Sequence, residues 1–293
     1  MRIDTPDGDF LDLDFTPLAR PGRPVVLLLH GLEGSARRGY ALNVYAELAM
    51  WGVGAVGLNF RSCGGEPNRL SRSYHSGETG DLAWCLGVLE QMLPGSPIGA
   101  VGFSLGGNVL LLHLGQAGEA ATRTLSACVA VSVPYDLSEC ERALDSTRMG
   151  RWYVRVFLKT LVRKAEAKAE LLPANVDLER IRRARTFREF DDAATAPLHG
   201  YASADDYYAR ASSATLINRI RVPTLLLQAM DDPFLPATAI PTTAIAANPC
   251  LQPVVTPRGG HVGFIAGRPW APHFWAEQEA ARFLAQRLLA ESE

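Results

Sequence analysis

The chain has 293 residues, of which 47% are hydrophobic and 20% charged, and its formal net charge is −2 at pH 7. This composition is typical of an ordinary globular protein and excludes a disordered or fibrous chain. The near-zero net charge also excludes the strong excess of Lys and Arg with which many nucleic-acid-binding proteins neutralise phosphates, so we expect no nucleic-acid partner.

The cysteines and the N-terminal residues indicate where the protein works. The five cysteines are widely spaced and include no CxxC pair, which favours reduced thiols over a disulfide framework or a zinc site. Residues 1–17 contain acidic side chains where a signal peptide needs an apolar core, and no run approaches the ~18 apolar residues of a membrane span. We therefore expect a cytoplasmic protein without a transmembrane segment.

Six short apolar runs, rich in β-forming residues, follow one another along the chain. They lie at residues 24–31, 52–60, 96–103, 125–134, 222–232 and 251–257. Their length and composition are typical of buried parallel strands. Helical patterns lie between most of them, at residues 40–52, 79–93, 105–118, 273–291 and, more weakly, 236–248. This alternation predicts a doubly wound, mostly parallel α/β sheet.

The alternation is interrupted once, between residues 135 and 220. From 148 to 188 this segment carries twelve Lys and Arg residues against four Asp and Glu residues, and its pattern is helical. Such a change in composition marks an insertion beside the carboxyl ends of strands, where ligands bind in α/β folds. We predict a core formed by residues 1–134 and 221–293, with a helical, basic lid or cap at 135–220.

One helix of this insertion is predicted to be amphipathic. Its apolar side recurs at helical spacing and consists of Met149, Trp152, Tyr153, Val156, Thr160 and Leu161. A neighbouring basic stripe consists of Arg148, Arg151, Arg155, Lys159 and Arg163. Two interpretations stay open: a lid whose basic face meets an anionic lipid surface, or a cap helix packed on the core with a solvated charged face. The apolar side favours an apolar acyl substrate in either case.

Ser104 stands in a Gly-Phe-Ser-Leu-Gly stretch between a predicted strand and a predicted helix. Backbones crowd at so sharp a turn, and Gly102, Gly106 and Gly107 relieve that crowding because they lack a Cβ. The turn presents the hydroxyl at the amino end of a helix, where unpaired N–H groups can stabilise an oxyanion. Ser104 is therefore a candidate nucleophile; the alternative is a glycine-rich turn with a bystander serine.

A serine hydroxyl needs a base, and the base needs a carboxylate to orient it. In strand-turn-helix sites of this kind the acid and then the histidine follow in loops after late strands. Asp231 and Asp232 end the run at 222–232, and His261 follows the next run. We favour Asp232 over Asp231, because the Pro-Phe-Leu-Pro that follows it resembles the acid loop of related hydrolases. The alternative for His261 is an ordinary surface-loop histidine.

An oxyanion hole needs a second N–H donor beside that of Leu105. The turn after the first long strand offers the N–H of Leu32, unless it is merely a glycine turn that ends the strand. His30, just before this turn, is expected to brace the loop, and His113, within a helix, to be satisfied locally. Ser76 or Thr79 is expected to cap the helix that begins near Asp81. Two further loop histidines have no assigned role: His75 and His199.

Six motifs, in their order along the chain, resemble those of the YheT-like α/β-hydrolases, a group related to the mammalian α/β-hydrolase-domain esterases and phospholipases. They are HGLEGS, NFRSCGGEPNRLSRSYHSGETGDL, GFSLGGN, REFDDAATAPLHGY, DDPFLP and GGHVGF. The resemblance spans residues 5–290 and implies an α/β-hydrolase fold with a Ser-His-Asp esterase site that uses no metal or organic cofactor. By position it makes Ser104 the nucleophile, His261 the base and Asp232 the orienting acid. The Ser-Cys of NFRSCGG departs from many relatives, so Cys63 either borders the pocket or fills a gap.

Together these features predict a serine hydrolase that cleaves carboxylic esters of medium- or long-chain acyl groups through an acyl-enzyme. Thioesterase or acyltransferase activity at the same triad is an alternative. A non-enzymatic ligand-binding protein that keeps the fold is another, because a fold does not by itself fix a function.

Overall fold

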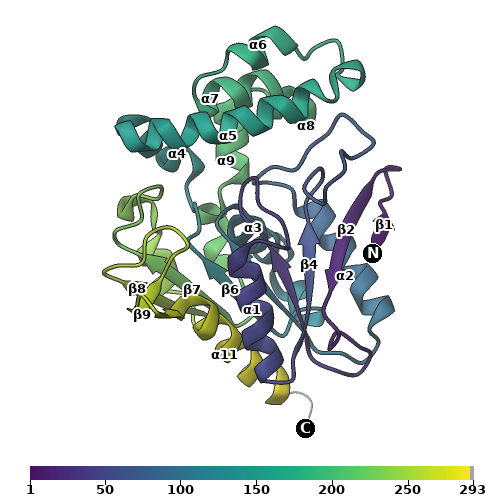
Figure 1. The fold of residues 1–293 in the computed structure, drawn as a ribbon, viewed down its shortest axis with the longest axis vertical. Helices are drawn as coiled ribbons and strands as arrows, with labels where there is room; N and C mark the ends of the chain where they lie inside the picture. The colour runs from purple at the N-terminus through teal and green to yellow at the C-terminus, as the bar shows by residue number, and fades with distance from the viewer. Residues whose placement is uncertain (291–293) are drawn as a thin grey trace.

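The computed structural model describes residues 1–290 and has an eight-stranded sheet at its centre, with helices on both faces (Figure 1). The strand order is β1-β2-β4-β3-β5-β6-β7-β8. All six predicted strands are present and parallel to one another: β3 (Val25–Leu29), β4 (Gly54–Asn59), β5 (Ile98–Phe103), β6 (Ala127–Val131), β7 (Thr224–Ala229) and β8 (Leu251–Thr256). The prediction of a doubly wound, mostly parallel α/β sheet is confirmed.

Alternate residues of the central strands face opposite layers of helices, as the period of two in a strand requires. Leu27 and Leu29 of β3 belong to the apolar cluster on one face, which α2 (Thr79–Met92) and α3 (Leu105–Ala117) cover. Val26 and Leu28 belong to the cluster on the other face, beneath α1 (Gly39–Met50) and α11 (Trp275–Ala290). Because both faces are covered, these strands are apolar throughout.

Several elements differ from the prediction. β1 (Arg2–Asp4) and β2 (Phe10–Phe15) form an antiparallel edge that we did not predict. The final helix begins at Trp275, because β9 (Ile265–Arg268) and β10 (Ala271–Phe274) form a hairpin before it, and residue 291 of the predicted helix lies outside the described residues. The weak helical pattern at 236–248 yields only α10 (Thr242–Ala246) and a 3₁₀ turn at Ala237–Ala239.

The prediction that Ser76 or Thr79 caps the N-terminus of α2 is also wrong. Glu78 is its N-cap residue, and the Glu78 side chain accepts a hydrogen bond from the backbone N–H of Asp81. Thr79 is already the first helical residue, and its hydroxyl bonds the side chain of Gln116. The Ser76 backbone N–H donates to the hydroxyl of Tyr207. A glutamate reaches the same helical N–H groups as the shorter side chains that usually cap helices.

Helices between residues 137 and 211 lie above the carboxyl ends of the parallel strands (Figure 1). They are α4 (Leu137–Ser146), α5 (Arg148–Glu166), α6 (Leu178–Arg183), α7 (Phe187–Phe190), the π-helical turn η3 (Asp191–Thr195), α8 (Ala196–His199) and α9 (Ala204–Ala211). We call them the cap helices. Several of them pack around an apolar cluster of their own. A division of the chain into domains at residues 134 and 221 stays a prediction.

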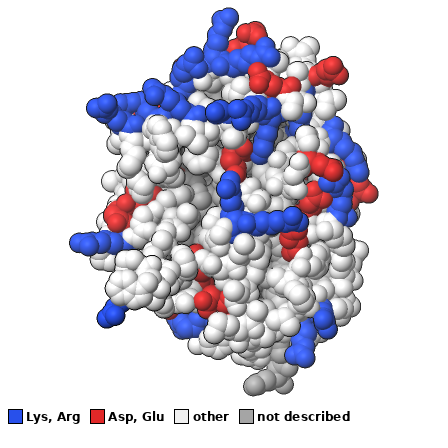
Figure 2. Space-filling view, viewed as in Figure 1, with Lys and Arg blue, Asp and Glu red and all other residues white. Residues whose placement is uncertain are grey.

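Figure 2 shows where the basic residues of this segment lie. Lys and Arg side chains form a band over the long helix α5 at the top of the molecule, as the composition of residues 148–188 leads one to expect.

The remaining elements are short 3₁₀ turns at Gly118–Arg123, Ala169–Leu171 and Ser213–Arg219.

Candidate active site

Ser104 occupies the tight turn between β5 and α3, and its φ is +52°, in the left-handed region. Side chains in this region cost about 1–3 kcal/mol and persist where the surroundings enforce them. Here α3 packs so close to the end of β3 that a Cβ on Gly106 would lie 2.5 Å from the carbonyl oxygen of Leu29. A Cβ on Gly102 would collide with the backbone of Gly106. Both glycines are therefore required for the turn that presents the Ser104 hydroxyl.

The structure brings Ser104, His261 and Asp232 together from the loops after β5, β8 and β7. The distance from Ser104 Oγ to His261 Nε2 is 2.9 Å, and that from His261 Nδ1 to Asp232 Oδ2 is 2.8 Å. The Asp232 side chain is fully buried, and its other oxygen accepts hydrogen bonds from the N–H groups of Phe234 and Leu235. A carboxylate fixed in this way orients the imidazole, so the imidazole can take a proton from the hydroxyl.

The neighbouring carboxylate, Asp231, has a different position. Its Oδ1 accepts the backbone N–H groups of Gly259 and Gly260, at 2.8 and 2.9 Å, so it holds the loop that leads to His261. The two aspartates that the sequence left as alternatives are thus separated by geometry: Asp232 contacts the imidazole and Asp231 contacts the backbone behind it.

The loop after β3 lies against Ser104. Residues Gly31 to Gly34 form a turn in which the N–H of Gly34 donates to the carbonyl of Gly31 at 3.0 Å. A Cβ on Gly31 would lie 3.3 Å from the Cβ of Ser104. Leu32, inside this turn, and Leu105, at the start of α3, both line the same cavity as Ser104. Both residues therefore border the space beside the Ser104 hydroxyl.

The contacts of His30 match its predicted role, which is to stabilise the turn after β3. Its Nδ1 lies 2.8 Å from the carbonyl oxygen of Gly31, and its Nε2 lies 3.2 Å from the N–H of Phe60. These contacts require a neutral ring with the proton on Nδ1. Burial supports that state, because it lowers the pKa of His30 to about 4. His113 lies half-buried within α3, and burial lowers its pKa.

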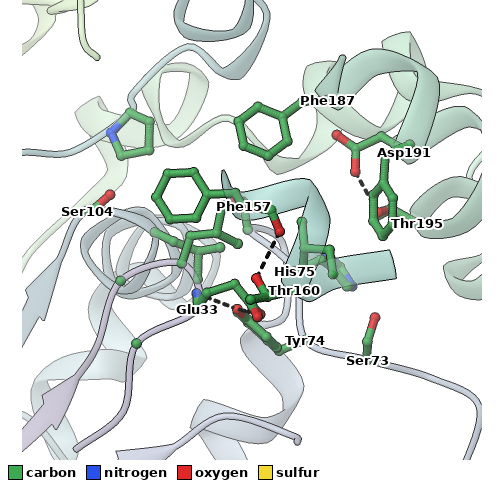
Figure 3. A pocket seen from close by; sticks show the side chains of 18 of the residues that line it. Glu33, Ser73, Tyr74, His75, Ser104, Phe157, Thr160, Phe187, Asp191 and Thr195 are labelled. Carbon is green, nitrogen blue, oxygen red and sulfur yellow. Dashed lines mark hydrogen bonds between the residues drawn. The ribbon is translucent and has the colours of Figure 1, made fainter. Parts of the chain in front are cut away.

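A cavity of about 680 Å³ extends from Ser104 under the cap helices, a size common for small-molecule sites. Figure 3 shows Phe157 and Phe187 near Ser104, with Ser73, His75, Asp191 and Thr195 at the other end. Much of the apolar lining comes from the cap helices: Tyr153, Val156, Phe157, Leu161, Phe187 and Leu198. An acyl chain can therefore be surrounded by apolar side chains close to the Ser104 hydroxyl.

The far end of the cavity carries a carboxyl group that sequence reasoning did not single out. Asp191 lies in the π-helical turn η3 and accepts hydrogen bonds from the hydroxyls of Thr195 (2.5 Å) and Tyr208 (2.8 Å). Burial raises the pKa of Asp191 to about 7. Perturbed carboxyls and π-helical turns are both frequent at functional sites. The REFDDAATAPLHGY motif contains this residue, but the motif alone gave it no role.

Cys63 is half-buried against the core cluster, with its Sγ 3.3 Å from the Nζ of Lys164, and burial raises the pKa of its thiol. It is absent from the lining of the cavity that holds Ser104. Of the two roles considered for it, filling a gap in the packing is the one that this position favours.

His75, Glu78 and His199 form the one group of potential metal ligands found among the described residues, with ligand atoms within 4.8 Å of one another. Their hydrogen bonds do not suit a cation. The N–H of Gly77 donates to His75 Nδ1, which leaves the proton on Nε2, and the Arg72 guanidinium already bonds the Glu78 carboxylate. Burial lowers the pKa of His75 to about 3 and that of His199 to about 2, so both rings stay neutral. Within this group, His199 of the cap contacts the core through the ring of His75, at a centroid distance of 4.3 Å, and through Ser73 Oγ at 3.4 Å.

Sequence reasoning also missed a contact between the loop of Leu32 and the cap. Glu33 accepts a hydrogen bond from the Nζ of Lys164 on α5 at 2.7 Å, although 131 residues separate the two. Glu33 lies in the HGLEGS motif and Lys164 in the basic segment, but two charged residues at that distance along the chain give no signal that they pair.

Among residues 1–290, no helix combines the length and apolarity needed to cross a membrane.

Comparison with known proteins identifies the family to which this chain belongs. A family described as the alpha/beta hydrolase fold matches residues 24–267. The Escherichia coli protein named "Putative esterase YheT" is 39% identical over 295 residues, covering 99% of this chain and 86% of that protein. Mouse "Phospholipase ABHD3" and the "Monoacylglycerol lipase" of Saccharomyces cerevisiae are each 32% identical, over 90% and 89% of this chain. The chain spans less than two thirds of these last two relatives, 66% and 59% of their lengths.

Solved structures agree on the fold. The Pyrococcus furiosus esterase Pf2001 aligns with a TM-score of 0.63 at 18% identity, over 98% of this chain and 90% of its own. Est1E from Butyrivibrio proteoclasticus, solved with ferulic acid, aligns with a TM-score of 0.62 at 15% identity, over 99% of each chain. The chain therefore belongs to the YheT-like family of α/β-hydrolases, an esterase- and lipase-type group within this fold.

Proposed function

We propose that this protein hydrolyses carboxylic esters through an acyl-enzyme, with Ser104 as nucleophile, His261 as general base and acid, and Asp232 as the orienting carboxylate. The observation that carries the proposal is the unbroken pair of contacts from Ser104 Oγ to His261 Nε2 and from His261 Nδ1 to Asp232 Oδ2.

In the first half of the reaction, His261 accepts the Ser104 proton as the oxygen attacks the ester carbonyl. The backbone N–H groups of Leu32 and Leu105 hold the resulting oxyanion at the amino end of α3. The imidazolium then gives its proton to the departing alcohol, which leaves an acyl group on Ser104. Water, activated by His261, releases the acid by the same steps in the second half.

The acyl group is proposed to be of medium or long chain. Phenyl rings and aliphatic side chains of the cap line the cavity near Ser104, and burial of each methylene against such groups contributes about 0.8 kcal/mol. Relatives named as a phospholipase and a monoacylglycerol lipase support a lipid-type ester. A short acyl chain would leave most of this lining without a partner.

This proposal is tested with p-nitrophenyl esters of two to sixteen carbons, using the wild-type protein and Ser104→Ala. We expect serine-dependent turnover whose kcat/KM rises with chain length to a maximum in the medium or long range. Circular dichroism of the variant checks that its fold is intact. Equal turnover by the folded variant would refute the role of Ser104, and a maximum at acetate would refute the acyl-chain assignment.

We also propose that α5 contacts an anionic lipid surface. Trp152, Met149 and Val156 are 56%, 55% and 46% exposed, unusual for apolar side chains on one helix, and exposed arginines flank them (Figure 2). From Trp152 a row of rings leads inward through Tyr153 and Phe234 to His261, with centroid distances of 4.9, 4.6 and 4.6 Å. An acyl chain leaving a lipid surface at Trp152 would follow apolar rings to the site.

Vesicle binding tests this contact. The double variant Arg151→Glu/Arg155→Glu is expected to lose co-sedimentation with vesicles rich in phosphatidylglycerol while its turnover of a water-soluble ester stays within about twofold. Binding to purely zwitterionic vesicles that equals binding to anionic ones, or unchanged binding by the variant, would contradict the proposal.

A further inference from the structure

Glu33 has a backbone conformation that its residue type does not favour. It is the third residue of the Gly31–Gly34 turn, and its φ is +52°. A left-handed residue at this turn position is usually Gly or Asn, because a Cβ strains the backbone there. The turn that contains Leu32 therefore depends on contacts that hold Glu33 in place.

Three hydrogen bonds from Tyr74 and Lys164 do so, beside a fourth in which the Arg38 guanidinium donates to the Glu33 carbonyl oxygen at 3.0 Å. The backbone N–H of Glu33 donates to the Tyr74 hydroxyl at 2.7 Å, and the same hydroxyl donates to Glu33 Oε1 at 2.8 Å. The third comes from Lys164, whose Nζ lies 2.7 Å from Glu33 Oε1. Figure 3 shows Glu33 beside Tyr74 on the wall of the cavity. Tyr74 belongs to the core, where its ring stacks on Phe60 at 5.3 Å, so it is a fixed partner.

Lys164 differs from Tyr74 because it belongs to the cap. It lies in the last turn of α5, and its side chain reaches the loop of Leu32 by bonding Glu33. Burial alone would lower the pKa of Lys164, but the charge of Glu33 and the hydrogen bonds to Glu33 and Cys63 outweigh burial and raise it. The ammonium group is therefore charged at neutral pH, and the ion pair forms only while α5 rests on the core.

We propose that Lys164 is a positioning residue that couples docking of α5 to completion of the oxyanion hole. With α5 docked, Lys164 and Tyr74 together hold Glu33, and the turn directs the N–H of Leu32 toward Ser104. When α5 moves away to admit a substrate, Glu33 keeps its bonds to Tyr74 and Arg38 but loses the ion pair, and the strained turn is then less firmly held. Ester cleavage is thereby confined to the covered cavity. This inference rests on the proposed function, since it assigns a support for that reaction.

A second lysine of the cap provides a matched comparison. Lys168, four residues further on, also reaches the core, where its Nζ bonds the side chain of Asn68 and the carbonyl oxygen of Arg72. It is buried, but neither partner belongs to the loop of Leu32. Loss of Lys168 weakens the attachment of the cap without touching Glu33, so the two lysines separate attachment in general from support of the oxyanion loop.

The test compares Lys164→Met, Lys164→Arg and Lys168→Met on a water-soluble short-chain ester. For Lys164→Met we expect kcat to fall about 10- to 100-fold with KM within about twofold, because a misdirected oxyanion donor weakens only the transition state. Lys164→Arg, which keeps the ion pair, should retain most of the activity. Lys168→Met should lower the melting temperature and leave kcat within about twofold.

Two further readouts exclude a merely structural effect. Affinity for a trifluoromethyl ketone, whose adduct with serine carries an oxyanion, should fall in parallel with kcat/KM in Lys164→Met. Glu33→Gln should lower kcat as well. The double variant should be little worse than the poorer single variant, because both changes remove the same ion pair between Glu33 and Lys164.

Other outcomes would overturn the inference. Unchanged kcat in Lys164→Met would do so, as would a rise in KM alone, which would make Lys164 a substrate contact. An equal loss in Lys168→Met would reduce the effect to general attachment of the cap. Full turnover by Ser104→Ala in the same assay is a separate result, since it would remove the proposed function on which the inference rests.

Discussion

The loops at the strand ends and the cap helices hold their functional groups in different ways. Asp232 is fixed by backbone N–H groups of its own loop, and Asp231 fixes the loop of His261 in the same manner. The cap reaches these loops through side chains, above all through Lys164 and the apolar lining. Backbone contacts hold the loops of Asp232 and His261 rigidly, whereas contacts made through side chains can be broken and remade. We expect changes in the loops to abolish catalysis and changes in the cap to alter its selectivity and control.

The largest effect is expected from the two adjacent aspartates. Asp232→Asn removes the acceptor that fixes the imidazole tautomer, and kcat should fall about 10⁴-fold, as such a change does in other serine triads. Asp231→Asn keeps an oxygen near Gly259 and Gly260 and should cost about tenfold or less. Steady-state kinetics on one soluble ester measures both. A larger loss in the Asp231 variant would reverse the two assignments.

A cap substitution should instead change the preferred acyl chain. Phe157→Ala removes a ring from the cavity wall near Ser104 (Figure 3), so kcat/KM for a decanoate ester should fall about tenfold while that for an acetate stays within about twofold. The ratio of the two values is the measurement. Equal losses on both esters would show that the cap acts on the reaction itself at this position.

The smallest effect concerns stability and pH at the far end of the cavity. The pKa of Asp191 is raised to about 7, so the folded state binds a proton that the unfolded state releases near pH 4. The stability that this proton contributes is present at pH 4 and is lost as pH rises through 7. Asp191→Asn lacks this loss, so its melting temperature relative to wild type should rise by about 2–4 °C between pH 5 and pH 8. A constant difference across this range would contradict the raised pKa.

The sequence predicted the parallel core well, because buried parallel strands leave continuous apolar runs. It missed β2, whose Phe-Leu-Asp-Leu-Asp-Phe sequence alternates: Leu11 and Leu13 are buried while Asp12 and Asp14 are paired with arginines. A strand near the edge of the sheet with only one covered face has a period of two rather than an apolar run. The hairpin of β9 and β10 is largely exposed, so burial left no pattern in its sequence.

Candidate site residues were predictable to the extent that each follows a strand. Ser104, Asp232 and His261 all stand at the end of a recognisable run or shortly after it, and the strand order then places them together. Glu33 and Lys164 have no such marker, since their contact depends on how α5 rests on the core. Asp191 likewise acquires its raised pKa only from the enclosure that the folded cap provides. Properties that arise from burial between distant segments required the structure.

The most direct test of the central claim is covalent labelling of the nucleophile. The wild-type protein is treated with an alkyl fluorophosphonate, and the modified residue is located by mass spectrometry of its peptides. We predict one phosphonylated residue, Ser104, with no labelling in Ser104→Ala and labelling at least 100-fold slower in His261→Ala. Labelling at another serine, or equal rates in the wild type and His261→Ala, would contradict the account.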